Sequence, residues 1–167
     1  MPTYTGISTV ETREAAWLTT TGDALPSLLS VNGGPWDVIQ AFWTRTPPTQ
    51  QTQCYVMSLT ISDERVANIR IRPVYEITLE LHWPVVMTGV PLAEGEQQAF
   101  RNAIDLLVQR IRGPIGDKTH GAFLSVAEVP REPGVHVVIE HPGTTVPASK
   151  ELRASVTYFA EDYEIND

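Results

Sequence analysis

The most regular pattern in the chain is a strict alternation of apolar and polar residues from Tyr75 to Trp83. The apolar positions are Tyr75, Ile77, Leu79, Leu81 and Trp83, and the polar positions are Glu76, Thr78, Glu80 and His82. A period of two is typical of a strand with one buried face and one face in solvent. Pro84 lacks the N–H that a further rung would need. The pattern therefore predicts a strand that ends there, with His82 on its solvent face.

After a loop rich in Pro and Gly, the spacing changes to that of a helix with one apolar side. The apolar stripe comprises Phe100, Ala103, Ile104, Leu107, Val108 and Ile111, and the polar side comprises Arg101, Asn102, Asp105, Gln109, Arg110 and Arg112. Glu94 and Glu96 near the start and two arginines near the end suit the helix dipole, and Gly113 ends the helix. We predict one long amphipathic helix packed over the sheet.

Residues 1–52 predict an irregular, partly helical segment. A short helix is expected at residues 11–18, with Thr9 or Thr12 near its start. The expected features that follow are a second helical turn with Leu25, Leu28 and Leu29 on one face, a turn at residues 32–34, a third helical stretch opened by Pro35 with Trp36, Ile39 and Trp43 on one face, and a surface loop at residues 44–53.

The rest of the chain predicts strands joined by hairpins and loops. The expected strands are residues 54–61, 66–72, 122–129, 135–141 and 152–160, with a hairpin turn at 62–65, a bulge or edge at Pro73, polar loops at 113–121 and 142–150, and an acidic tail at 161–167. We predict a single α+β domain over residues 1–167. Its core, residues 53–167, is expected to hold a mostly antiparallel sheet of about five or six strands.

Composition indicates an ordinary globular protein. With 167 residues, 42% hydrophobic and 19% charged, the chain can bury roughly 70% of its unfolded surface and needs no disulfide or metal to hold a core. The single Cys54 is expected to be a buried, inert thiol, which fits a reducing cytosol. No apolar run approaches the roughly 20 residues of a membrane-spanning helix, and the N-terminus does not have the pattern of a signal peptide.

The charge balance is acidic. Twelve basic and twenty acidic residues give a formal charge of −8. The densest basic cluster, Arg65, Arg70 and Arg72, is too small for a stripe that grips phosphates. We therefore do not expect the chain to hold nucleic acid, although repelling DNA or letting it slide past is compatible with this charge.

A search for chemistry predicts no catalytic, cofactor-binding or metal-binding residue, and hence a protein that is not an enzyme. His82, His120, His136 and His141 have no metal-ligand spacing, Asp117, Thr119 and His120 share a polar loop without a nucleophile elbow, and Gly33-Gly34 and residues 113–116 lack the spacing of a phosphate-binding loop. Glu76 and Glu80 would lie about 13 Å apart on a strand, too far for a glycosidase pair.

The four tryptophans are a different signal. Trp83 fits the core, and Trp17 lies in the expected first helix. Trp36 and Trp43 lie in a segment flanked by Pro and Gly, and aromatic residues are enriched at interface hot spots. We consider these two residues a candidate partner surface, with burial in the core as the alternative.

The order of elements resembles a known family. A hairpin, a strand reading Arg72-Pro73-Val74-Tyr75-Glu76-Ile77-Thr78-Leu79-Glu80-Leu81-His82-Trp83-Pro84, one amphipathic helix from Ala99 to Arg112, a closing hairpin and a C-terminal strand follow one another. Over about residues 54–165 this order is similar to that of the tail terminator proteins of long-tailed phages, particularly those of actinobacterial hosts. The resemblance implies a ring, usually of six subunits, at the head–tail junction of the virion.

Such a ring would sit on the last ring of the tail tube, stop its polymerisation and join the head connector. Each subunit would make a heterologous contact that closes by rotation. Six copies at −8 each would carry a charge of −48, so DNA could pass through an acidic lumen without specific binding. Two alternatives stay open: a head-side connector or stopper, and a small soluble enzyme or ligand-binding domain in which Asp117, His120 and His141 are the first suspects.

Overall fold

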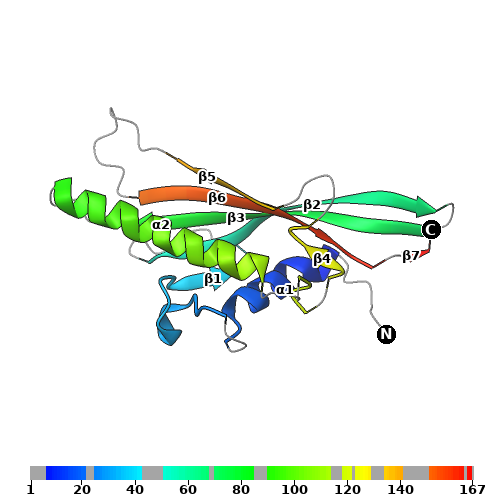
Figure 1. The fold of residues 1–167 in the computed structure, drawn as a ribbon, viewed down its shortest axis with the longest axis horizontal. Coiled ribbons are helices and arrows are strands. Elements are labelled where there is room, and N and C mark those ends of the chain that lie inside the picture. Colours follow the sequence, from blue (N-terminus) through cyan, green and yellow to red (C-terminus); the bar gives the residue numbers. More distant parts are fainter. Residues whose placement is uncertain are drawn as a thin grey trace.

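A computed structural model describes residues 7–21, 25–42, 51–67, 70–84, 90–113, 118–121, 123–128, 134–140, 151–163 and 165–166. Within these ranges the chain forms two α-helices and a seven-stranded mixed sheet, which confirms the α+β class (Figure 1). The elements are α1 (Ile7–Thr19), a 3-10 turn (Ser30–Asn32), β1 (Val38–Gln40), β2 (Gln53–Ala67), β3 (Arg70–Pro84), α2 (Val90–Arg112), β4 (Ser125–Val126), β5 (Val135–Ile139), β6 (Glu151–Glu161) and β7 (Ile165–Asn166).

β3 is the central strand of the sheet. It pairs antiparallel with β2 on one side and with β6 on the other. β5 and β4 lie one after the other along the second edge of β6, and β7 pairs with the start of β3. The alternation predicted from Tyr75 to Leu81 is confirmed, because the apolar residues are fully buried while Glu76 and Glu80 are half-buried. His82 is the exception, since it is buried and its ring contacts Tyr55 edge-on.

α2 packs its predicted apolar stripe against the sheet. The buried residues of this stripe are Phe100, Ala103, Ile104, Leu107, Val108 and Ile111. Trp83 Nε1 on β3 donates a hydrogen bond to Glu96 Oε2 (2.9 Å), which ties the helix to the strand below it. The helix begins at Val90, so neither predicted acidic residue lies in its first turn. Gly113, with φ 70°, ends it as expected.

The predicted hairpin turn at residues 62–65 is wrong. β2 continues to Ala67, which pairs with Arg70, and Pro73 lies inside β3 opposite Asp63 rather than at a break. The turn preference of a few polar residues is weak, and continuous cross-strand pairing overrides it. The strand expected at residues 122–129 is limited to Ser125–Val126, and the acidic tail contains the unpredicted β7.

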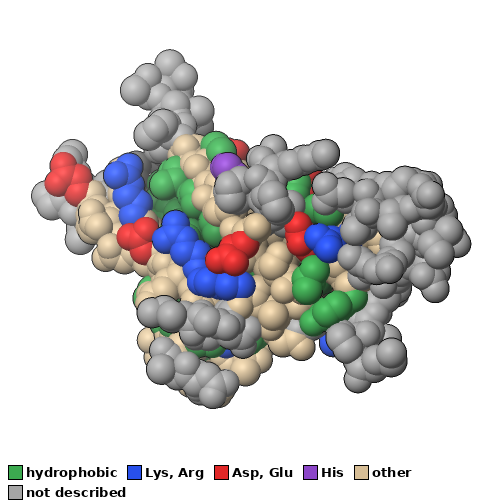
Figure 2. Space-filling model, turned by 45° about the vertical axis from the view of Figure 1, so that its right-hand side comes forward, with side chains coloured by type: hydrophobic (Ala, Val, Ile, Leu, Met, Phe, Trp, Pro, Cys, Tyr) green, Lys and Arg blue, Asp and Glu red, His purple; other side chains and the backbone are tan. Residues whose placement is uncertain are grey.

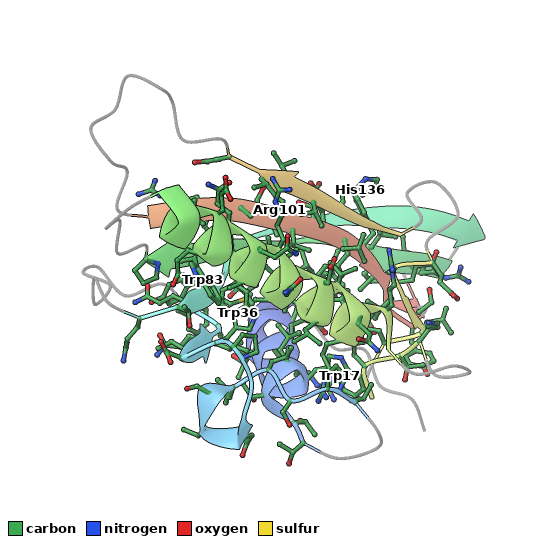
Figure 3. All side chains as sticks on the ribbon, turned by 60° about the vertical axis from the view of Figure 1, so that its left-hand side comes forward. Trp17, Trp36, Trp83, Arg101 and His136 are labelled. Atoms are coloured by element: carbon green, nitrogen blue, oxygen red, sulfur yellow. The ribbon has the colours of Figure 1, made fainter. Side chains whose placement is uncertain are left out.

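The N-terminal predictions are only partly correct. α1 exists but begins at Ile7, while the second and third helical stretches are wrong. Leu29 forms a bridge to Trp36, and β1 pairs parallel with β2. Trp36 is fully buried with its ring edge-on to Trp83 and Phe100, so this aromatic cluster, and not helical spacing, decides the local structure (Figure 3).

With a second helix and one parallel strand pair, the expectation of a single helix on an antiparallel sheet is only partly confirmed. The buried position of Trp36 also overturns its candidacy as a partner surface. Trp43 and most of the loop predicted at residues 44–53 lie outside the described residues.

Candidate functional site

A buried polar cluster joins three distant parts of the chain. His120 Nδ1, from the segment after α2, lies 2.9 Å and 3.1 Å from the carboxylate oxygens of Glu14 on α1. Tyr158 on β6 donates its hydroxyl to Glu14 Oε2 at 2.5 Å. The side chains of Glu14 and His120 are each only 1% exposed. His120 is therefore hydrogen-bonded inside the fold, in the segment predicted as a polar loop.

Both nitrogens of the His120 ring are engaged. Nε2 lies 2.6 Å from the carbonyl oxygen of Ile111 near the end of α2. A carbonyl can only accept, so Nε2 carries a proton and Nδ1 faces the Glu14 carboxylate. The ring also stacks on Trp17 with a centroid separation of 4.8 Å. His120 thus fixes the C-terminal end of α2 to α1.

Arg110 makes a second buried link between the two helices. It was predicted on the polar side of α2, but it is fully buried, which corrects that prediction. Its guanidinium donates to the carbonyl oxygens of Trp17 (2.8 Å), Thr20 and Pro26 (3.4 Å), and it lies 5.1 Å from the centre of the Trp17 ring. The cation therefore binds carbonyl oxygens at the C-terminal end of α1 and in the segment that follows it.

The polar side chains of this cluster hold parts of the fold together. Its polar atoms are occupied by one another and by backbone carbonyls, and burial together with the neighbouring Glu14 carboxylate raises the pKa of Tyr158. A catalytic role for His120 would require it to meet a substrate, whereas here it is packed inside the fold. Asp117 and His141, the other first suspects, lie outside the described residues.

The remaining candidates are dispersed. His136 is exposed on β5. Cys54 is buried as predicted, and burial raises the pKa of its thiol. Across the part of the chain that the structure describes, no group of three or more His, Cys, Asp or Glu residues could hold a metal ion.

A groove lies between α2 and β5, with a volume of about 940 Å³. Its apolar residues are Ile104, Val108, Val135, Val137 and Ile139, and its polar residues are Gln98, Arg101, Asp105, Gln109, Arg112 and Lys118. Figure 3 shows Arg101 on α2 beside β5, which carries His136. One face of the molecule carries basic side chains next to acidic and hydrophobic ones (Figure 2). We call this feature the α2–β5 groove.

β5 borders this groove with an open edge. It pairs with β6 on one side, and no other described strand pairs with it. Val137 and Val138 on this strand are 37% and 62% exposed. An open edge beside exposed valines is a ready template for contact with another chain.

Sequence reasoning missed the main features of both sites. Glu14, Arg110 and Tyr158 were treated as ordinary helix and strand residues, and no local pattern marks them as partners. One feature of the sequence could have indicated the groove. The run Val135–Ile139 places valines on both faces of a short strand, so one of them faces away from the core.

Comparisons with known proteins give no family. No protein-family model matches the chain. A search of curated protein sequences also returns no match. Neither helix described here has a stretch long and apolar enough to cross a bilayer.

Proposed function

We propose that this chain is a structural virion protein, a phage tail terminator that forms a ring on the end of the tail tube. The observation that supports this best is the α2–β5 groove beside the open edge of β5. Both features belong to contact surfaces: open edges pair with other chains, and exposed apolar patches mark interaction sites.

The buried polar side chains, in contrast, serve the fold. Glu14, His120 and Tyr158 are buried and bonded among themselves, and Arg110 is buried against the end of α1. The surface therefore carries the apolar groove and the open strand edge, whereas these polar side chains are buried inside the fold. This distribution favours an assembly role over an enzyme that uses His120.

The long hairpin suits contact with a neighbouring ring. β2 and β3 stay paired from Gln53 and His82 to Ala67 and Arg70, and the far half of this hairpin extends beyond the helices (Figure 1). We call this far half of the β2–β3 hairpin the arm. In a ring of six subunits, six arms would extend toward the tail tube or the head connector. We assign the arm to the partner contact and the α2–β5 groove to the contact between subunits.

The acidic charge suits a channel for DNA. Glu76 and Glu80 lie on the face of β3 opposite its buried apolar residues, and both are half-buried. If this face lines the lumen, six copies would present a ring of acids that repels phosphates, so DNA would pass without specific binding.

Native mass spectrometry of the purified chain tests the proposal, over a concentration series and with tail tubes purified from the same phage. We expect a closed ring, free or on the tubes, and binding to tube ends. A ring that ignores tubes and binds the head connector instead would replace the terminator with the head-side stopper. A chain that stays monomeric throughout and ignores both partners would overturn the proposal.

A further inference from the structure

The ring of His120 lies between two hydrogen-bond acceptors, and this geometry fixes the number of protons at the buried pair. Nε2 lies 2.6 Å from the carbonyl oxygen of Ile111, so Nε2 carries a proton. In a neutral ring Nδ1 then holds a lone pair, yet Nδ1 lies 2.9 Å from Glu14 Oε2. Two acceptors at hydrogen-bond distance need a proton between them. A further proton therefore lies between Nδ1 and the Glu14 carboxyl group.

The hydroxyl proton of Tyr158 does not fill this role. Tyr158 donates it to Glu14 Oε2, and burial, followed by the charge of Glu14, raises the pKa of this phenol. The further proton belongs to Glu14 and His120 together, either as carboxylate and imidazolium or as carboxylic acid and neutral imidazole. Both arrangements hold one proton more than a carboxylate beside a neutral ring.

Three described groups surround the pair on the neighbouring elements. They are Tyr158 on β6, Cys54 on β2, which interacts electrostatically with Tyr158, and Arg110 on α2, which lies against the Trp17 ring on which the imidazole stacks. Arg110 stays charged at every ordinary pH, and burial raises the pKa of the Cys54 thiol. Among these described groups, the exchange of a proton near neutral pH therefore falls to the pair itself.

The backbone holds the imidazole in this position. The φ angle of His120 is 47°, in the left-handed region that residues other than glycine seldom adopt. Such a conformation persists only where the surroundings over-determine it. Here they comprise the Glu14 carboxyl group, the Ile111 carbonyl and the Trp17 ring. Loss of the further proton would thus leave two buried acceptors facing each other.

We propose that the Glu14–His120 pair is a proton-dependent latch, which takes up one proton when α1 docks on the segment after α2. In an unfolded chain glutamate and histidine titrate at about pH 4.3 and 6.5, so above about pH 6.5 the two side chains hold no proton between them. Closing the latch then takes a proton from solvent. The equilibrium constant for closing falls about tenfold per pH unit above that point, for as long as the closed pair keeps its proton. The latch does not depend on the proposed ring.

Urea unfolding of the full chain from about pH 6 to about pH 8.5 tests the latch. In Glu14→Gln the new amide donates to a neutral Nδ1 while its oxygen accepts from Tyr158, so no further proton is needed. Glu11→Gln, on the same helix but outside the pair, is the matched control. The remaining histidines are common to all three proteins, so their titration cancels in the comparison.

We expect the unfolding constant of the parent to rise with pH more steeply than that of Glu14→Gln, by about tenfold per pH unit. Glu11→Gln should follow the parent. Parallel profiles for the parent and Glu14→Gln would overturn the latch.

Nuclear magnetic resonance of the parent chain decides the matter even if Glu14→Gln does not fold. The ring nitrogens of His120 are assigned by replacing His82, His136 and His141 with glutamine one at a time. At about pH 7.5 we expect either a protonated Nδ1 or a protonated Glu14 carboxyl group, seen by ¹⁵N and ¹³C shifts. An unprotonated Nδ1 beside an ionised Glu14 would overturn the proposal.

Discussion

His120 Nδ1 lies 2.9 Å from Glu14 Oε2, although the two residues are 106 positions apart in the chain. Through this pair the segment after α2 is fixed to α1, and Tyr158 brings β6 to the same carboxylate. The ring of His120 spans from Glu14 to the Ile111 carbonyl, so α1 and the end of α2 are held in one position. The N-terminal helix is thereby part of the core and not an appendage.

The Glu14–His120 pair should show strong coupling. Glu14→Leu or His120→Leu alone leaves the partner buried and unpaired, so each should lower the free energy of unfolding by about 3–5 kcal/mol. The double variant should cost clearly less than the sum of the two, because neither member of the Glu14–His120 pair is then left buried without the other. Urea denaturation measures all four proteins, with His136→Leu on the surface as a near-neutral control; additive costs would contradict the coupling.

Arg110 should be far more important for stability than its neighbours on α2. Arg110→Met keeps a long side chain but removes the guanidinium that donates to the carbonyls of Trp17, Thr20 and Pro26, so it should lower the free energy of unfolding by about 1–3 kcal/mol. Arg101→Met, at an exposed position of the same helix, should change stability by no more than about 0.5 kcal/mol. Equal thermal shifts for the two variants would refute this role.

Alkaline pH should destabilise the fold through Tyr158 and Cys54. Both groups have a raised pKa in the folded state, so the folded chain holds their protons where the unfolded chain releases them. Their stabilisation is complete below the ordinary pKa values of 9.0 for the thiol and 10.0 for the phenol, and it is lost as the pH rises above them.

Tyr158→Phe isolates one of these two contributions. The variant should be less stable than the parent at neutral pH, because the hydrogen bond to Glu14 is lost. Above about pH 10 its stability should fall less steeply than that of the parent, because no phenol remains to titrate. Urea midpoints across this pH range measure both effects, and parallel pH profiles would exclude Tyr158 as the cause.

Two glycine substitutions should have opposite effects. A Cβ at Gly34 would overlap the carbonyl of Leu28 and lie 2.6 Å from the carbonyl oxygen of Ser27, so Gly34→Ala should destabilise the turn before β1. A Cβ at Gly95 meets nothing within 4 Å, and alanine is better than glycine inside a helix by about 1 kcal/mol. Melting temperatures should fall for Gly34→Ala and rise for Gly95→Ala; a fall for both would leave the clash unsupported.

Reversing charge on the open face of β3 should impede DNA if the proposed ring forms. Glu76→Lys with Glu80→Lys would place lysines where phosphates pass, so phage carrying this variant should release DNA slowly. Glu94→Lys with Glu128→Lys makes the same charge change at exposed positions elsewhere and is the control. Normal DNA release by the first variant would count against a lumen on this face.

The long elements were predictable because each depends on residues within itself. Alternation around Tyr75 and in β6 predicts strands, and the stripe from Phe100 to Ile111 predicts a helix; burial agrees in each case. The hairpin turn and the helical stretches around Leu28 and Trp36 were mispredicted. There, weak local preferences competed with strand pairing and aromatic packing that involve residues far along the chain.

By itself, therefore, the sequence determined the class of the fold, the central strands, the face that α2 buries and the acidic charge. The tertiary structure alone decided that His120 and Arg110 are buried, because their partners lie 106 and 93 positions away and no local period records them. It also decided that α2 and β5 enclose a groove. A groove forms only if two elements lie a certain distance apart. The periodicity of side chains shows which face each element buries, but it does not show that distance.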